Sequence, residues 1–156
     1  MAEAFAPLAA EREPEVVWSA PSIYVRADSL ALRQILINFL ENAVKYGPRG
    51  QTVHVTVEQD RAWVRVHVDD ESAGVPAEAR EGIWRAFYRR DEAVRTGETG
   101  SGIGRSVARD LALQYGGRVS VSDSPSGGAR FTVEFPCVRA GRVQPGRTTV
   151  TTLSRS

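Results

Sequence analysis

Hydrophobic residues recur along this chain with two different periods, and the longer period predicts a helix in the first third of the sequence. The apolar positions of that stretch are Leu32, Ile35, Leu36, Phe39 and Ala43. Their spacing of three and four residues is typical of a helix that buries one side. Asp28 or Ser29 is suited to N-cap this helix, and Gly47-Pro48 ends it. We therefore expect a helix from Leu30 to Tyr46.

The shorter period appears in two runs of valine alternating with polar residues, at residues 52–58 and 63–70. Strict alternation is typical of strands with one buried face, and the short link between the runs predicts an antiparallel hairpin. A second hairpin is predicted from residues 118–124 and 130–136, which are joined by residues 125–129. The chain thus supplies at least two pairs of neighbouring strands.

Another helix is predicted from Ile103 to Tyr115. Val107 and Leu111 complete its apolar stripe, and Gly116-Gly117 ends it. The order of long helix, hairpin, glycine-rich loop, helix and hairpin is typical of helices packed on one face of a sheet.

These elements predict an α+β fold, a two-layer α/β sandwich with about three helices on one face of a mixed, mostly antiparallel sheet of about five strands. The shortest helical stretch is expected around Ala79 to Phe87. Residues 1–21 form a lead-in segment, interpreted as the remnant of an upstream helix followed by an edge strand. Residues 22–137 form the folded domain. Residues 138–156, with four arginines and no acidic residue, are predicted to be a disordered basic tail.

Composition adds few constraints. The chain has 156 residues, 42% of them hydrophobic, and a formal net charge of +1, so no global charge favours nucleic acid or an anionic membrane. Its single cysteine, Cys137, excludes an intramolecular disulfide and favours a reducing, cytoplasmic location. No apolar run approaches the roughly 20 residues of a membrane span, so we expect no membrane contact by this domain.

Three scarce side chains fall on the first predicted helix. Asn38 and Asn42 are the only asparagines of the chain and Lys45 is its only lysine. Their spacing of four and three residues places them on one helix face, roughly 120° from the apolar stripe. An asparagine oxygen suits Mg²⁺ and a lysine suits phosphate. From spacing alone, a solvated face with incidental polar residues is equally good.

Two further stretches favour a ligand site. Asp70 follows a predicted strand, and Gly74 comes four residues later, so a carboxylate could meet an amino group where the backbone approaches a flat ring. The alternative is a solvated turn. Gly100, Gly102 and Gly104 alternate before the second helix, where backbone N–H groups and the helix dipole attract anions. A flexible hinge is the alternative, while a dinucleotide-binding turn is excluded because no βαβ unit precedes the loop.

Taken together, the order of these stretches resembles a known family. "LRQILINFLENAVKYG" is similar to the N box of the ATP-binding catalytic domain of sensor histidine kinases. "DESAGVP" stands where the G1 box belongs, "GIWRAFYRRD" where the F box belongs, and "TGSGIGRSVARDLALQYGG" is similar to the G2 box. The resemblance runs from about Asp28 to Pro136. It implies the Bergerat-type ATP-binding fold of the gyrase, Hsp90, histidine kinase and MutL superfamily.

The resemblance implies roles in holding Mg²⁺ and the phosphates of ATP. Asn42 would ligate Mg²⁺, and Asn38 would support the metal and the phosphates. Lys45 would pair with phosphate oxygens, and Arg89 would reach the terminal phosphate from a mobile lid. The phosphates would also meet the glycine-rich loop at Gly100, Gly102, Ile103 and Gly104.

It implies a second set of roles around adenine. Tyr46 would pack on the base, Asp70 would accept a hydrogen bond from its amino group, and Gly74 would let it lie close. Ser72 departs from the family, which usually has glycine there. Its Cβ and hydroxyl would stand where the backbone approaches the nucleotide, so altered adenine binding is expected.

The function implied is phosphoryl transfer from Mg·ATP to a histidine on a separate helical dimerisation domain, and then to a response regulator. Neither His54 nor His67 has the sequence context of that acceptor, and both are expected to be ordinary surface residues of a strand. The chain is therefore interpreted as the catalytic part of a longer protein. A membrane-anchored parent protein fits this interpretation. No nucleic-acid partner is implied.

Two alternatives stay open. Ser72 and Arg85, which stands where the family has glutamate, favour a nucleotide-binding regulatory module without catalysis. Trp84 replaces a usual phenylalanine but keeps an aromatic plug. The other alternative is an ATP-hydrolysing member of the superfamily. Such members place a glutamate where Asn38 stands, and a neutral amide cannot accept a proton from water. Glu41 lies nearby but points elsewhere on the helix.

Overall fold

The computed structural model of this chain describes residues 12–19, 24–85, 104–137 and 150–152. Its main element is a five-stranded sheet in the order β1-β3-β4-β6-β5. The strands are β1 (Glu15–Ser19), β3 (Thr52–Gln59), β4 (Trp63–Asp69), β5 (Arg118–Asp123) and β6 (Ala129–Pro136). β1 runs parallel to β3 and the other neighbouring pairs of this sheet are antiparallel, so the sheet is mixed and mostly antiparallel, as predicted.

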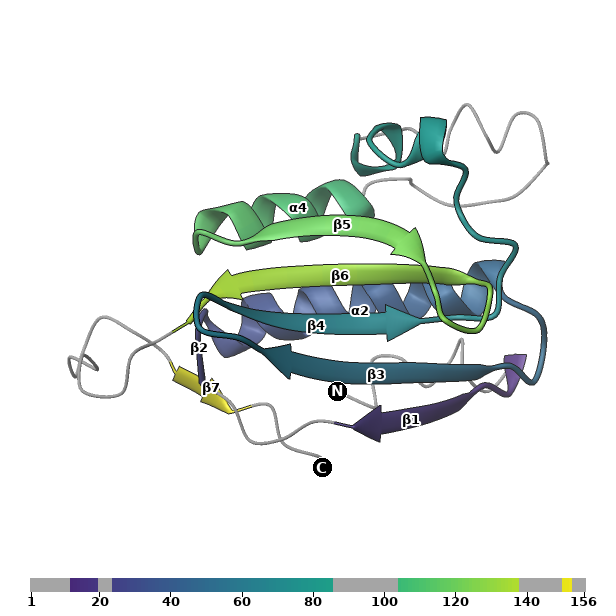
Figure 1. The fold of residues 1–156 in the computed structure, drawn as a ribbon, viewed down its shortest axis with the longest axis horizontal. Coiled ribbons are helices and arrows are strands. Elements are labelled where there is room, and N and C mark those ends of the chain that lie inside the picture. The colour runs from purple at the N-terminus through teal and green to yellow at the C-terminus, as the bar shows by residue number, and fades with distance from the viewer. Residues whose placement is uncertain (1–11, 20–23, 86–103, 138–149, 153–156) are drawn as a thin grey trace.

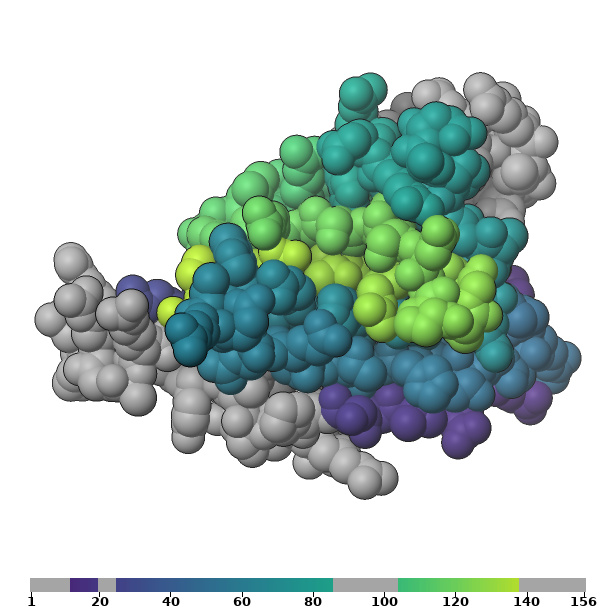
Figure 2. Space-filling view, viewed as in Figure 1, coloured from purple at the N-terminus to yellow at the C-terminus, as the bar shows by residue number. Residues whose placement is uncertain are grey.

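Helices cover one face of the sheet. In the described residues these are the α-helices α2 (Ser29–Tyr46) and α4 (Gly104–Gln114), which pass behind the strands in Figure 1. Figure 2 shows the opposite face, formed by the side chains of the strands. The predicted two-layer α+β sandwich is confirmed. Neither α2 nor α4 combines the length and apolar composition that crossing a bilayer requires.

The long helix α2 begins and ends where its sequence signals predict. The Leu30 N–H donates a hydrogen bond to Oδ1 of Asp28, the N-cap, at 3.1 Å. At the other end the Gly47 N–H donates to the Ala43 carbonyl at 3.0 Å, and Pro48 has no N–H with which to continue the helix. The predicted apolar stripe is at most 1% exposed, at Leu32, Ile35, Leu36, Phe39 and Ala43.

The valines of the first hairpin form the inner face of the sheet. Five of them are fully buried: Val53, Val55, Val64, Val66 and Val68. On the outer face His54 is exposed, as predicted, but His67 is only 5% exposed. Its Nδ1 lies 2.8 Å from Thr132 Oγ1 and its Nε2 lies 3.1 Å from Glu58 Oε2. The expectation of a surface His67 is wrong because the neighbouring strands β3 and β6 supply polar partners that enclose the ring.

The stripe predicted for the second helix is also wrong in part. α4 buries Arg105, Ala108 and Ala112, while Val107 is 39% exposed. Ala108 and Ala112, four residues apart, share one side of α4 and are fully buried in the core. Leu111 only partly joins the core. The buried side of α4 is set by the elements packed against it, which include α2, and the periodicity of the sequence does not reveal them.

The segment expected to hold one short helix instead holds two 3-10 helices, η1 (Ala77–Ala79) and η2 (Gly82–Trp84). Gly82, the first residue of η2, disfavours a continuous α-helix because glycine loses the most backbone entropy in a helix. The part of the prediction beyond Arg85 lies outside the described residues.

Both ends of the chain contribute strands. β1, within the predicted lead-in segment, is an edge strand of the main sheet. A second, two-stranded sheet pairs β2 (Tyr24–Arg26) with β7 (Val150–Thr152) in antiparallel register. The three residues of β7 belong to the segment predicted to be disordered, and for them that prediction is wrong. Valine and threonine are strong strand formers, and β2 offers them a free edge.

We expect the free energy of unfolding to depend on the buried stripe of α2. Leu36→Ala should lower it by about 2–5 kcal/mol, because it deletes a fully buried side chain and leaves a cavity. Leu30→Ala, the same change in the same helix at a position 68% exposed, is the control and should cost less than about 0.5 kcal/mol. Urea denaturation measures both. Equal losses would contradict the assignment of the core face.

Candidate functional site

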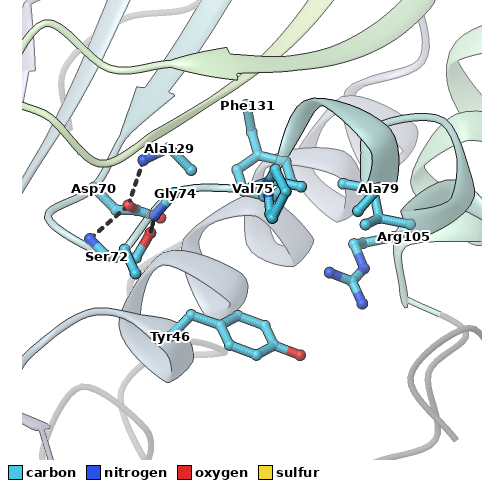
Figure 3. A pocket seen from close by; sticks show the side chains of 12 residues that line it. Tyr46, Asp70, Ser72, Gly74, Val75, Ala79, Arg105, Ala129 and Phe131 are labelled. Atoms are coloured by element: carbon cyan, nitrogen blue, oxygen red, sulfur yellow. Dashed lines mark hydrogen bonds between the residues drawn. The ribbon is translucent and has the colours of Figure 1, made fainter. Parts of the chain in front are cut away.

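One cavity opens between the end of α2, the start of α4 and the loop that follows β4. Its volume is about 240 Å³. Among the residues that line it are Tyr46, Asp70, Ser72, Gly74, Arg105 and Phe131 (Figure 3). Three of these, Tyr46, Asp70 and Gly74, are residues that the sequence predicted to surround a base. The cavity lies just below the roughly 300–1,000 Å³ of typical ligand pockets, so it suits a flat base better than a whole nucleotide.

Asp70 is the fixed point of this cavity. Its side chain is 1% exposed, and Oδ1 accepts hydrogen bonds from the backbone N–H groups of Ser72 and Ala129, both at 2.9 Å. Its own N–H donates to the Ala129 carbonyl at 3.0 Å. No group among the described residues donates to Oδ2. A carboxylate held in this way presents one oxygen as an acceptor to whatever occupies the cavity.

The strand ends beside Asp70 are tied together on the other face of the sheet. Arg130 donates from Nε to Asp69 Oδ1 at 2.7 Å and from Nη2 to Asp69 Oδ2 at 2.8 Å. These bonds to Asp69 raise the pKa of the Arg130 guanidinium. Because Asp69 and Asp70 are consecutive in an extended backbone, they point to opposite faces. The bidentate pair thus fixes β4 against β6 at the point where Asp70 enters the cavity.

Two glycines let the backbone take this shape. Gly74 has a φ of +82°, which side-chain-bearing residues rarely adopt. Gly128 is close against Asp70: an added Cβ would overlap the Asp70 carbonyl oxygen and lie 2.7 Å from Oδ1. Sequence reasoning identified Gly74 but missed Gly128, whose neighbour Asp70 is distant in sequence.

The serine that departs from the family pattern fits the loop. Ser72 Oγ accepts a hydrogen bond from the Gly74 N–H at 3.1 Å, and the Ser72 N–H binds Asp70. Among the described residues with side chains only Glu13 has a positive φ, so Ser72 carries no strain of that kind. The hydroxyl therefore stabilises the turn that places Asp70, although Ser72 still lines the cavity.

A cluster of three aromatic rings supports one wall of the cavity. Trp84 is 4% exposed and packs against Phe39 and Phe131, with ring centroids 6.1 and 5.9 Å away. Phe39 and Phe131 are themselves 5.5 Å apart. The expectation that Trp84 keeps an aromatic plug is confirmed. Phe131 and Ile83 extend this cluster to the cavity surface, which gives the cavity an apolar wall.

A cation that sequence reasoning missed forms part of the opposite wall. Arg105 is 7% exposed, lines the cavity, and places its guanidinium carbon 5.8 Å from the centre of the Tyr46 ring. Figure 3 shows it extending toward the cavity from the side away from Asp70. Its position directly after Gly104 of the glycine-rich loop was the available signal for a role in the site. The apolar periodicity of α4 does not include Arg105, so sequence reasoning passed over it.

The scarce side chains of α2 are more enclosed than a solvated face would be. Asn38 is 6% exposed and Asn42 is 8% exposed, while Lys45 is partly buried. Asn38 Nδ2 donates to the Gly104 carbonyl at 2.9 Å, and Gln34 Nε2 lies 3.5 Å from Asn38 Oδ1. The first turn of α4 covers this part of α2. The alternative of a solvated face is therefore wrong for the two asparagines.

Asn42 lies between the two ends of the site. Asn38, Asn42 and Tyr46 follow one another at four-residue intervals, so they share one side of α2. Asn38 contacts the start of α4, and Tyr46 lines the cavity. The side-chain amide of Asn42 makes no hydrogen bond with another described residue. Asn42 and Lys45 do not line the cavity itself.

Four of the predicted site residues cannot be placed. Arg89, Gly100, Gly102 and Ile103 lie outside the described residues. Of the glycine-rich loop, only Gly104 is described, at the first position of α4 and beside Asn38. The structure thus brings Tyr46, Asp70 and Gly74 together in a cavity, and Asn38 and Gly104 together next to it.

Comparisons with known proteins agree with this geometry. A family described as "Histidine kinase-, DNA gyrase B-, and HSP90-like ATPase" matches residues 27–139. The chain is 39% identical over 129 residues to the sensor protein kinase CarS of Pseudomonas aeruginosa, covering 82% of this chain and 28% of that protein. It is 37% identical over 113 residues to the adaptive-response sensory kinase SasA of a Synechococcus species, covering 72% of this chain and 29% of that protein.

Solved structures give the same result. Full-length ShkA in complex with AMPPNP superposes with a TM-score of 0.69 at 34% identity, over 88% of this chain and 29% of that chain. The mycobacterial sensor histidine kinase MprB, at 24% identity, shares the fold with a TM-score of 0.72, over 86% of this chain and 90% of that chain.

The chain spans less than a third of the length of the two curated relatives, CarS and SasA. It belongs to the family of histidine kinase-, DNA gyrase B- and HSP90-like ATPases, as a catalytic domain of the sensor histidine kinase kind.

Proposed function

We propose that this chain binds Mg·ATP and delivers the γ-phosphate to a histidine on a separate helical dimerisation domain. The observation that carries the proposal is the buried Asp70 carboxylate, fixed by two backbone N–H groups and directed into a cavity of about 240 Å³. The solved ShkA relative, which holds AMPPNP, supports a nucleotide as the ligand.

Adenine fits the polarity of this cavity better than guanine does. Asp70 Oδ2 can only accept, so it requires a donor on the bound base. The exocyclic amino group of adenine is such a donor, while guanine carries a carbonyl oxygen at the same ring position. Gly74 and Ser72 let the backbone lie beside the base, and Phe131 gives it an apolar surface. An unpaired carboxylate facing an oxygen would cost binding energy.

The phosphates would extend from the cavity along α2 toward the start of α4. Asn42 fits a role in holding Mg²⁺, because its amide oxygen is a hard ligand and no described residue hydrogen-bonds to it. Asn38 keeps Gly104 in place beside this path. Lys45, in the last turn of α2, adds positive charge for the phosphate oxygens. When bound, Mg²⁺ would neutralise charge on the phosphates during transfer.

The residues of this chain would then act by positioning and by electrostatics. Asp70 and Tyr46 hold the base, so the triphosphate tail is anchored at one end. Asn38, Asn42 and Lys45 fix its direction, and Arg89 is proposed to meet the terminal phosphate. His67 is enclosed between Thr132 and Glu58, and neither His54 nor His67 lines the cavity, which supports an acceptor histidine outside this chain.

The partners follow from the same proposal. The relatives are named as sensor kinases and sensory kinases, and they are more than three times as long as the region they share with this chain. We propose that the parent protein carries the histidine-bearing helices, and that the phosphate passes on to a response regulator. A cytoplasmic location with a membrane-anchored parent suits such a protein.

The two alternatives gain no support from the geometry. Ser72, which motivated a non-catalytic module, fits the Asp70 turn without a positive φ. For a hydrolysing enzyme, the position of the water-activating base is occupied by Asn38, whose amide is bonded to the Gly104 carbonyl. Glu41 is exposed and so lies away from that contact.

Binding should depend on Asp70 and not on an aspartate outside the cavity. We expect Asp70→Asn to weaken Mg·ATP binding at least tenfold, because hydrogen bonds to charged groups contribute about 1.5–3 kcal/mol. Asp110→Asn is the matched control: the same change at an exposed position of α4 that does not line the cavity should alter the affinity less than about threefold. Calorimetric titration measures both. Equal affinities for the wild type and Asp70→Asn would contradict the site.

Transfer to histidine should require this domain, ATP and Mg²⁺ together. The chain is mixed with the isolated histidine-bearing helical domain of its parent and with γ-labelled ATP. We expect acid-labile label on the helical domain, loss of the label with chelator, and at least about tenfold slower labelling with Asn42→Ala. Nucleotide binding without any transfer would favour the regulatory module, and phosphate release without labelling would favour the hydrolysing enzyme.

A further inference from the structure

We propose that Arg105 binds the phosphate nearest the ribose, so that this cavity selects adenine nucleotides over adenosine. The inference rests on the proposed function, because it adds a contact to the same ligand. The family resemblance implied roles for other residues of the site, but none for Arg105. Its basis is the position of a buried guanidinium at the end of the cavity remote from Asp70.

Arg105 is buried and points toward the cavity. Arg105 is 7% exposed although it carries a charge, and it lines the cavity together with Tyr46. The guanidinium carbon lies 5.8 Å from the centre of the Tyr46 ring, so the ring supports one face of the charged group. The side chain points toward the cavity in Figure 3, with Asp70 on the other side.

The placement of the two charged groups gives the ligand a direction. Asp70 is an acceptor and would take the amino edge of the base. A base that meets Asp70 with its amino edge directs its ribose and phosphates away from Asp70, which is the direction of Arg105 (Figure 3). Arg105 cannot accept a hydrogen bond, since a guanidinium has only donors. Ribose-linked phosphate oxygens match it, as two parallel N–H groups can bind two of them.

The charge environment favours an anion at the same place. Arg105 stands in the first turn of α4, and that turn contains no acidic residue. The N-terminus of a helix carries partial positive charge, which favours an anionic ligand there. A phosphate between Arg105 and the start of α4 would meet both positive groups. Asn38, bonded to Gly104, holds the start of α4 at this point.

The test compares adenosine with AMP, without Mg²⁺, by titration of the 156-residue chain followed by NMR. We expect Arg105→Leu to weaken AMP binding at least tenfold, as loss of a charged hydrogen bond implies, and to change adenosine binding less than threefold. Arg105→Lys should retain part of the AMP affinity. Arg109→Leu, an exposed arginine one turn further along α4, should change neither affinity.

The ratio of the two affinities is read in each variant, and the NMR spectrum of the variant shows that it is folded before the ratio is interpreted. Equal losses for adenosine and AMP with Arg105→Leu would reduce Arg105 to a support for Tyr46 and overturn the proposal. Unchanged affinities for both compounds would overturn it as well, with nucleotide binding intact. If the wild-type chain binds neither compound nor ATP, the proposed function itself fails.

Discussion

The site depends on one constraint, the fixation of a single carboxylate at the end of a buried strand. Asp70 directly follows β4 with its side chain turned to the helix side of the sheet, and two backbone N–H groups donate to one of its oxygens. One of these N–H groups belongs to Ala129 at the start of β6, so the strand pairing itself orients the acceptor. Gly128 has no side chain because Asp70 occupies that space. The same contacts of Asp70 therefore pack the turn, pair β4 with β6 and orient the acceptor oxygen for a ligand.

Helix α2 links this acceptor to the rest of the site. One side of the helix is fully buried against the valines of the sheet, which fixes its axis and rotation. That rotation places Tyr46 at the cavity and Asn38 against the Gly104 carbonyl, one at each end of the same polar side. A side chain in the core, such as Leu36, thus controls the position of polar groups that it does not touch. A functional face can stay aligned because the apolar face leaves the helix no freedom to rotate.

Much of the fold could be predicted from the sequence because its signals are local. The caps of α2 and the alternation of Val53 to Val68 need only neighbours along the chain. Asp70 and Gly74 were found for the same reason, since five consecutive residues contain the whole turn. The errors concern tertiary contacts. α4 buries Ala108 and Ala112 instead of Val107, and Thr132 and Glu58 enclose His67.

The site residues divide in the same way. Arg105 and Gly128 were missed because each acquires its meaning from a partner far away in sequence, Tyr46 for one and Asp70 for the other. The burial of Asn38 could not be predicted either, since it depends on where α4 begins. Scarcity was the useful signal for these α2 residues: a chain that otherwise uses arginine placed its one lysine and both asparagines within eight positions.

The most direct measurement is a crystal structure of this chain with Mg²⁺ and a non-hydrolysable ATP analogue. We expect the amino nitrogen of the base within about 3 Å of Asp70 Oδ2, with the ring between Tyr46 and the loop at Gly74. A base bound elsewhere, or one whose amino group faces away from Asp70, would show that the fixed carboxylate is not what selects the ligand.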